Sequence, residues 1–232
     1  HLESGQYTQA ELTSLCNELT DQLNTLSDSL GRDSDGLADM GKDLQDRARA
    51  AMFSLGATYP ELSGYYPQPK GLLFPAFLSV QNLSGIYSPF TIEANYNSAM
   101  VSYNLPFTIC HELSHLRGFM QEEEANFIGF LACVNADDTA FNYSGYLLGW
   151  IYATNELYEA DYDTFVEIYN RLSDNVKADL SANSSFWKRY DSKVAEVSGQ
   201  INDHYLKANG QSDGIKSYDR MVDLMITWFR SK

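Results

Sequence analysis

Leucine recurs at steps of three and four residues along the N-terminal part of the chain, a spacing that places apolar side chains on one face of a helix. The apolar positions of this first segment are Leu12, Leu15, Leu19, Leu23, Leu26 and Leu30. The same spacing returns after a polar turn, at Leu37, Met40, Leu44, Ala48, Met52 and Leu55. The pattern predicts an N-terminal hairpin of two antiparallel helices over residues 1–57. A coiled-coil dimer seam is the alternative interpretation, although each segment holds few heptads.

Residues 58–100 follow a different pattern, in which prolines and glycines repeatedly interrupt any helical period. Short apolar runs predict the strands of a small sheet, at 71–77, 85–87 and 91–96. We expect this sheet to lie beside the central helices of the chain and to cover both of them. Glu93 and Asn95 are candidates to line a cleft there, and a turn or capping role is an equally good interpretation of each.

From residue 101 to the C-terminus the pattern is helical again. Beyond the first central segment, the apolar spacing predicts helices near 121–135, 143–159, 162–172, 185–207 and 214–230. The chain is therefore expected to form one α+β domain, mostly α-helical, over residues 1–232. Its expected parts are the hairpin at 1–57, the sheet and loops at 58–100, two central helices at 101–136 and the remaining helices at 137–232.

Length, composition and charge agree with one folded domain and narrow the possible partners. The 232 residues are 44% hydrophobic and include 16 tyrosines and 12 phenylalanines, enough for a sizeable core. The formal net charge of −15 argues against a nucleic-acid partner, because phosphate binding requires basic surface patches. No apolar run reaches the length of a membrane span, and the start at His1 without methionine is expected of a processed product. We interpret the three cysteines as buried thiols rather than a disulfide: Cys16, Cys110 and Cys133.

The string HELSH at residues 111–115 is the most informative motif of the chain. Residues four apart on a helix share one face, so His111 and His115 can bind the same ion, with Glu112 beside that ion and not on it. A zinc ion held in this way keeps a position open for water, and a neighbouring carboxylate can accept the proton of that water. The apolar run Pro106–Cys110 indicates that the helix enters a core, where buried histidines need polar partners. Two solvated histidines on a surface helix are the alternative interpretation.

A third ligand is expected on a second helix that follows Gly118, a residue that readily ends a helix in the left-handed conformation. The stripe of this helix that carries Glu122 and Asn126 is otherwise small: Ala125, Gly129 and Cys133. Small residues allow the two helices to approach closely, so that Glu122 reaches the ion and Asn126 supports a histidine by its other ring nitrogen. Glu124, on a more apolar stripe, is the alternative ligand. Glu123 is interpreted as a solvated residue of the first turn.

The central segment PFTICHELSHLRGFMQEEEANFIGFLAC resembles a bacterial family without an assigned function, domain-of-unknown-function family 3810. The resemblance extends to the strings GIYSPFTIEANYN, YSGYL and YLKANGQSDGIKSYDRMVDL, so that it covers the chain discontinuously from about Gly85 to Leu224. It implies a zincin-like fold, and membrane-spanning helices that precede the domain and lie outside this chain. The expected location is therefore the extracytoplasmic face of a bacterial membrane. The step EEEAN also resembles the third-ligand segment of gluzincin peptidases. This resemblance implies that Glu122 is a ligand and that Asn126 supports a ligand histidine.

The expected function is zinc-dependent hydrolysis, most simply of a peptide bond, by a zinc-bound water with Glu112 as general base. Zinc is the expected cofactor, held by the two motif histidines and Glu122. Tyr218 and His204 are candidate hydrogen-bond donors to the reaction's oxyanion, and plain core packing is the alternative for each. The expected partner is a peptide or protein substrate. Two other classes remain open: a zinc-bearing binding or sensor domain that cleaves nothing, and a helical interaction module with an accidental motif.

Overall fold

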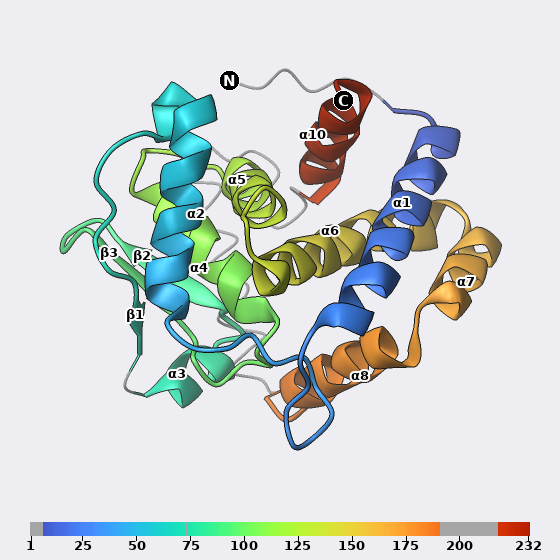
Figure 1. Ribbon diagram of the computed structural model, residues 1–232, viewed down its shortest axis with the longest axis horizontal. Coiled ribbons are helices and arrows are strands. Elements are labelled where there is room, and N and C mark those ends of the chain that lie inside the picture. Colours follow the sequence, from blue (N-terminus) through green and yellow to red (C-terminus); the bar gives the residue numbers. More distant parts are fainter. Residues whose placement is uncertain (1–6, 73, 191–217) are drawn as a thin grey trace.

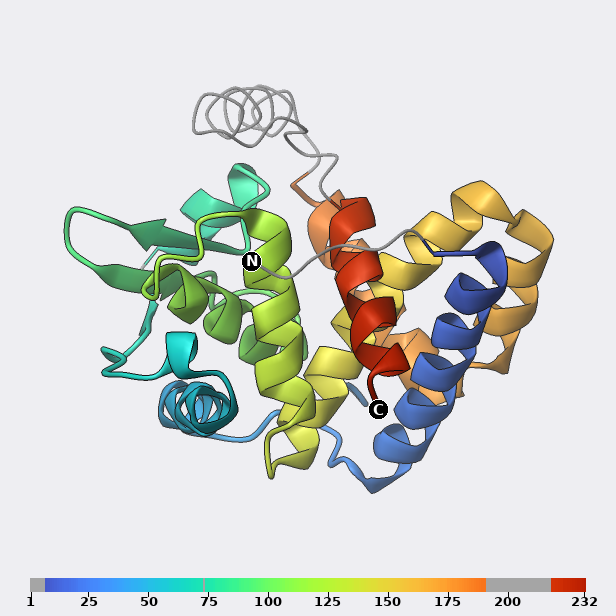
Figure 2. The ribbon, with the colours of Figure 1, turned by 90° about the horizontal axis from the view of Figure 1, so that it is seen from above.

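The computed structural model describes residues 7–72, 74–190 and 218–232 of the chain (Figure 1). In chain order the elements are α1 (Gln9–Ser29), α2 (Leu44–Thr58), the 3₁₀ turn η1 (Pro60–Leu62), β1 (Lys70–Gly71), α3 (Pro75–Val80), β2 (Gly85–Ser88), β3 (Glu93–Tyr96), α4 (Asn104–His115), α5 (Glu122–Val134), α6 (Thr139–Ala160), α7 (Tyr162–Arg171), α8 (Asp174–Lys188) and α10 (Tyr218–Arg230). Helices dominate and the strands form one small sheet, so the predicted α+β class is confirmed. Figure 2 shows the sheet, α2 and α3 on one side of α5, and α1, α6 and α7 on the other.

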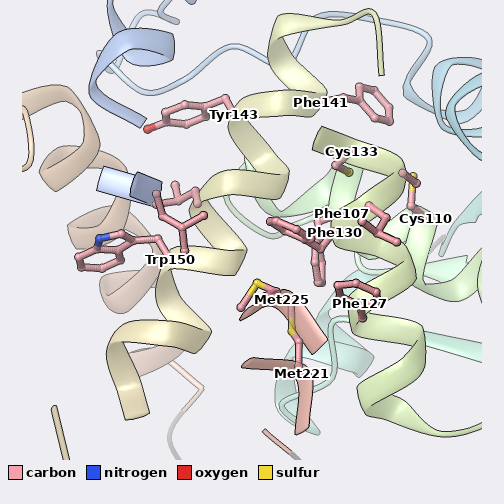
Figure 3. Close-up of a cluster of buried hydrophobic side chains, with 14 of the residues drawn as sticks. Phe107, Cys110, Phe127, Phe130, Cys133, Phe141, Tyr143, Trp150, Met221 and Met225 are labelled. Atoms are coloured by element: carbon pink, nitrogen blue, oxygen red, sulfur yellow. The ribbon is translucent and has the colours of Figure 1, made fainter. Parts of the chain in front are cut away.

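The core lies where α6 crosses α4 and α5, and α10 packs against the same group (Figure 3). Phe107 from α4, Phe130 from α5, Trp150 from α6 and Met225 from α10 are all buried there. Gly149 of α6 allows the close approach, since a Cβ at that position would lie 2.9 Å from the Phe130 ring. Burial of these apolar side chains drives the packing, at about 25 cal/mol for each Å² removed from water.

All three cysteines are buried thiols, as predicted. Cys110 of α4 and Cys133 of α5 lie in the same core region (Figure 3). Burial raises the pKa of the Cys16 thiol to about 12 and raises that of Cys133 well above its usual value, so both are poor nucleophiles. The thiols therefore act as small apolar side chains.

The predicted N-terminal hairpin is wrong. α1 packs on α6, α7 and α8, whereas α2 packs on α4 and α5, and the two helices lie on opposite sides of the molecule in Figures 1 and 2. The loop between them is tied to α8, because buried Asp179 accepts hydrogen bonds from Arg32 Nη1 at 2.8 Å and from the Ala38 N–H at 2.9 Å. The chain therefore crosses the molecule before α2 begins at Leu44.

The small sheet has the strand order β1-β3-β2, with β1 parallel and β2 antiparallel to β3. β2 and β3 pack on α4. The expectation that the sheet would also cover α5 is wrong, since α5 packs on α2, α6 and α10 instead. The predicted strand at 71–77 is also wrong beyond Gly71, because Pro75 begins the short helix α3, a position where a missing N–H costs little.

Glu93 and Asn95 have roles in the sheet and its turn. Glu93 forms an ion pair with Lys70 and accepts a hydrogen bond of 3.1 Å from the Thr91 hydroxyl. The Asn95 amide donates to the Ile86 carbonyl of the neighbouring strand at 3.4 Å. The turn interpretation of these two residues is therefore the one that agrees with the contacts.

Four of the helices predicted beyond the motif are found, as α5, α6, α7 and α10. α8 was not predicted: it begins at Asp174, and Ser173 caps it by accepting a hydrogen bond from the Val176 N–H at 3.4 Å. The helix predicted at 185–207 overlaps only the end of α8, which stops at Lys188, and its residues 191–207 lie outside the described residues. None of the described helices has the length and apolar character needed to cross a membrane.

Candidate metal centre

α4 carries the HELSH motif into the core. Every residue of this helix from Pro106 to His115 is buried, as predicted. Its first turns are held by Ser144 of α6, whose hydroxyl accepts a hydrogen bond from the Phe107 N–H and donates one to the Tyr103 carbonyl. These bonds satisfy backbone groups that a buried helix start would otherwise leave without partners.

The turn between α4 and α5 brings the two helices side by side. Gly118 has φ of +87°, the left-handed conformation expected of a helix stop. α5 then begins at Glu122 and packs along α4. At Gly129 a Cβ would lie 3.3 Å from both the His111 backbone nitrogen and the Phe107 carbonyl oxygen. The row of small residues that the sequence predicted on α5 therefore allows the backbones of α4 and α5 to approach closely. This approach brings Glu122 next to His111 and His115.

Three potential ligand residues converge where α4 meets the start of α5. The Nε2 atoms of His111 and His115 lie 3.2 Å apart. Oε2 of Glu122 lies 3.2 Å from His111 Nε2, and its Oε1 lies 3.8 Å from His115 Nε2. Two atoms bound to zinc at about 2.1 Å and at a tetrahedral angle are about 3.4 Å apart. The spacing fits a single ion, and these three residues could hold a metal.

His115 and Glu122 are in the protonation states that metal binding requires, a neutral imidazole and an ionised carboxylate. Burial and the charge of His111 lower the pKa of His115 to about 4, so this ring is neutral near pH 7. Burial acts to raise the pKa of Glu122, but its hydrogen bond with His111 and its electrostatic interactions with His111 and His115 lower it overall. Burial opposes a charge on His111, yet Glu122 and Glu112 raise its pKa. A metal ion and a proton therefore compete for His111.

The second ring nitrogens of the two histidines differ in their surroundings. His115 Nδ1 lies 2.7 Å from the Phe119 carbonyl, a bond that orients the ring with Nε2 towards the ligand position. His111 Nδ1 is buried and has no hydrogen-bond partner in the described part of the chain. Asn126, predicted to support a histidine, lies close enough to His111 to raise the pKa of that ring. The support from Phe119 was missed because a backbone carbonyl leaves no signal in residue type.

Glu112 lies beside the three-residue group and not within it. Its Oε1 is 3.9 Å from His111 Nε2, and its Oε2 has no hydrogen-bond partner among the described residues. Burial raises the pKa of Glu112 to about 8, an effect that His111 opposes and Glu122 reinforces. A carboxyl group that exchanges a proton near neutral pH is suited to general acid–base chemistry.

Strand β2 contacts the motif at two points. Gly85 lies against Glu112, since a Cβ at Gly85 would be 2.7 Å from the carboxyl carbon. Two residues further, on the same face of the strand, the ring centroid of Tyr87 is 5.9 Å from that of His115. Sequence reasoning singled out neither residue. The alternation of side chains along a strand places Gly85 and Tyr87 on one face. The sequence pattern does not indicate which helix packs against that face.

Three further predictions concern residues around this group. Glu124, the alternative third ligand, does not belong to the only candidate metal-binding group found among the described residues. The prediction that Glu123 is solvated is wrong: it is buried, and its Oε1 lies 3.1 Å from Arg220 Nη1 because α10 packs on α5. His204 lies outside the described residues, and Tyr218 is described only as the first residue of α10.

Comparison with known families agrees with the resemblance found in the motif segment. A family model described as protein of unknown function (DUF3810) matches residues 1–226. The chain belongs to this family. The match extends over the N-terminal helices as well as the segments from 85 to 224 that carried the resemblance. Neither the curated proteins nor the solved structures give a match to this chain. The family description assigns no chemistry, which must be inferred from the site.

Proposed function

We propose that this protein is a zinc-dependent metallopeptidase with a zincin-like site. The proposal rests on a potential metal-ligand group with a buried carboxyl group directly beside it. His111, His115 and Glu122 present ligand atoms at spacings that suit one zinc ion. The buried carboxyl group of Glu112 stands beside them without being part of the group. A purely structural metal site gains nothing from an additional buried carboxyl group, because its burial costs free energy.

The donor set favours zinc over the common alkaline-earth ions. Two imidazole nitrogens and one carboxylate oxygen form a known class of catalytic zinc site, in which a fourth position stays open. When bound, zinc supplies a water of lowered pKa and polarises a substrate carbonyl group. Calcium and magnesium prefer sites built from oxygen atoms alone, which the two histidines here do not provide.

Glu112 is the proton carrier in this proposal. Its carboxylate accepts a proton from the attacking water while the water oxygen bonds to the carbonyl carbon of the peptide. Glu112 then delivers that proton to the leaving nitrogen as the C–N bond breaks, so that the base is regenerated. The Glu112 carboxyl group lies beside the ligand group without belonging to it, which supports this double role.

In this proposal, strand β2 holds the substrate in an extended conformation. It is an edge strand, and no other described strand pairs with its outer side. The backbone groups of an edge strand can bind a peptide as one further strand. Because Gly85 and Tyr87 contact the motif helix, a peptide added to this edge would pass close to the ligand group. The proposed partner is therefore a peptide or protein substrate.

The location is a separate part of the proposal and rests on the family resemblance alone. We propose that helices outside this sequence attach the domain to a bacterial membrane, with the site on the extracytoplasmic face. Externally added protease should degrade this domain in intact spheroplasts that produce the full-length protein, whereas a cytoplasmic marker should survive. Survival of the domain in intact spheroplasts would reverse the proposed orientation.

Zinc content and hydrolysis can be tested together on the purified chain. After reconstitution at neutral pH, elemental analysis should find about one zinc per chain. The zinc-loaded protein should cleave bonds in insulin B chain, with fragments identified by mass spectrometry, and Glu112→Gln should keep the zinc and lose the cleavage. Failure to bind zinc would refute the proposal. Zinc binding without cleavage of insulin B chain or of a broad peptide library would instead favour a zinc-bearing binding or sensor domain.

A further inference from the structure

Strand β2 presents one face to the two motif residues that matter most for the proposed chemistry. Gly85 and Tyr87 share that face because side chains alternate along a strand. Gly85 lies against Glu112, and the Tyr87 ring lies beside the His115 ring with an interplanar angle of 35°. The intervening Ile86 points away and is 47% exposed. Tyr87 is therefore the residue of β2 whose side chain reaches the ligand group.

The Tyr87 side chain is half-buried, and its hydroxyl forms no hydrogen bond with any other residue that the structure describes. Other tyrosines of the chain have such partners: the Tyr66 hydroxyl donates to the Leu62 carbonyl at 2.6 Å, and the Tyr143 hydroxyl donates to Asp179. The Tyr87 hydroxyl is not buried and remains open to solvent. The Tyr87 hydroxyl is thus available to a bound molecule.

The charged groups of the motif helix and Glu122 have other roles. His111, His115 and Glu122 form the ligand group, and Glu112 is the proton carrier. Arg117 follows the motif directly, but its guanidinium donates to the backbone carbonyls of residues 63 and 65 and lies over the Tyr66 ring. Amide hydrolysis creates a negative charge on the former carbonyl oxygen, and sites that accelerate it place a hydrogen-bond donor there.

We propose that Tyr87 is a catalytic residue that donates a hydrogen bond from its hydroxyl to the carbonyl oxygen of the substrate as that oxygen becomes negatively charged. The phenol keeps its proton throughout, so no bond to Tyr87 is made or broken. The hydrogen bond is stronger to the negatively charged oxygen than to the neutral carbonyl, and this difference lowers the barrier. The inference rests on the proposed hydrolysis, and it replaces Tyr218 and His204 as the donor.

The test compares Tyr87→Phe with the wild-type chain, each loaded with zinc. Phenylalanine keeps the ring beside His115, so zinc stoichiometry and affinity should be unchanged. kcat on insulin B chain should fall about a hundredfold with little change in KM, the usual effect of removing one such donor. Tyr158→Phe is the matched control, because Tyr158 is 52% exposed on α6 and should show wild-type kinetics.

A second readout does not depend on turnover. Calorimetry should show that N-phosphoryl-Leu-Trp, whose tetrahedral phosphoryl group mimics the charged oxygen, binds Tyr87→Phe about a hundredfold more weakly than wild type. The uncleaved insulin B chain should bind equally to Glu112→Gln and to the Glu112→Gln, Tyr87→Phe double variant. Wild-type kcat and phosphoryl-dipeptide affinity in Tyr87→Phe, or loss of its zinc, would overturn the proposal. Absence of cleavage by the wild-type chain would refute the hydrolase function, and the phosphoryl-dipeptide affinities would still decide the role of Tyr87.

Discussion

Gly85 of β2 lies in direct contact with the carboxyl group of Glu112: a Cβ added at Gly85 would be 2.7 Å from Cδ and 2.8 Å from Cγ of that side chain. The strand can approach this closely because glycine has no side chain. The contact shields one side of Glu112 from water, and burial is the main cause of the raised pKa of this group. Two segments that are distant in the sequence therefore set the proton affinity of the proposed base together.

Gly85→Ala should impair hydrolysis while leaving the metal in place. The added methyl group must displace the Glu112 carboxyl group, and a misplacement of about 1 Å can cost about a hundredfold in rate. We expect kcat to fall by that order and zinc stoichiometry to stay at the wild-type value. Gly31→Ala is the matched control, because nothing lies within 4 Å of a Cβ at that position. Equal kcat for the two variants would show that the contact has no catalytic importance.

The third ligand can be identified by zinc titration of variants in α5. Glu122→Ala should abolish tight zinc binding, because a three-ligand site loses much of its affinity with one ligand. Asn126→Ala should weaken binding by about ten- to a hundredfold, as is usual for a residue that supports a ligand. Glu124→Ala, the matched control on the same helix, should bind zinc as the wild type does. Tight binding in Glu122→Ala together with its loss in Glu124→Ala would contradict the assignment.

The metal-free protein should lose stability through Glu112 as the pH rises. Burial raises the pKa of Glu112 from 4.5 to about 8, so over this window the folded state keeps a proton that the unfolded state has released. The contribution of Glu112 to the free energy of unfolding therefore falls between pH 4.5 and pH 8.

Glu112→Gln removes that titration and should be more stable than the wild type by at least about 1 kcal/mol at pH 8.5, with a smaller advantage at pH 5.5. Urea unfolding of both metal-free proteins at the two pH values measures this difference. The contributions of the other titrating groups are nearly the same in both proteins and cancel in the comparison. A stability difference independent of pH would mean that the pKa of Glu112 is close to its ordinary value.

Gly129→Val should separate the two helices of the site. A Cβ at Gly129 already lies 3.3 Å from the α4 backbone at His111, so a branched side chain cannot be accommodated without a shift. We expect the free energy of unfolding to fall by about 1–3 kcal/mol, and zinc affinity to fall because Glu122 moves away from the histidines. Ala57→Val on the exposed face of α2 is the control, with an expected cost of a few tenths of a kcal/mol. Wild-type zinc affinity in Gly129→Val would show that the close approach is not required.

The residues that converge at the candidate metal centre could be identified from the sequence because their geometry is local. The face shared by His111 and His115 follows from the helical period, and Gly118 marks the end of that helix by its conformational preference. The stripe of small residues through Gly129 indicated which face of α5 meets α4. The period of one helix was thus sufficient to select Glu122 as the neighbour of the histidines.

The sequence alone determined where most helices lie, that the chain is mostly helical, and which side chains share a face. Only the tertiary structure decided that α1 and α2 bury their apolar faces on different partners, that Glu123 forms an ion pair with Arg220, and that Tyr87 lies beside His115. The physical reason is the same for all three. Periodicity specifies that a face must be buried, whereas the partner of that face depends on contacts between segments far apart in the chain, and these are set by the packing of the whole core.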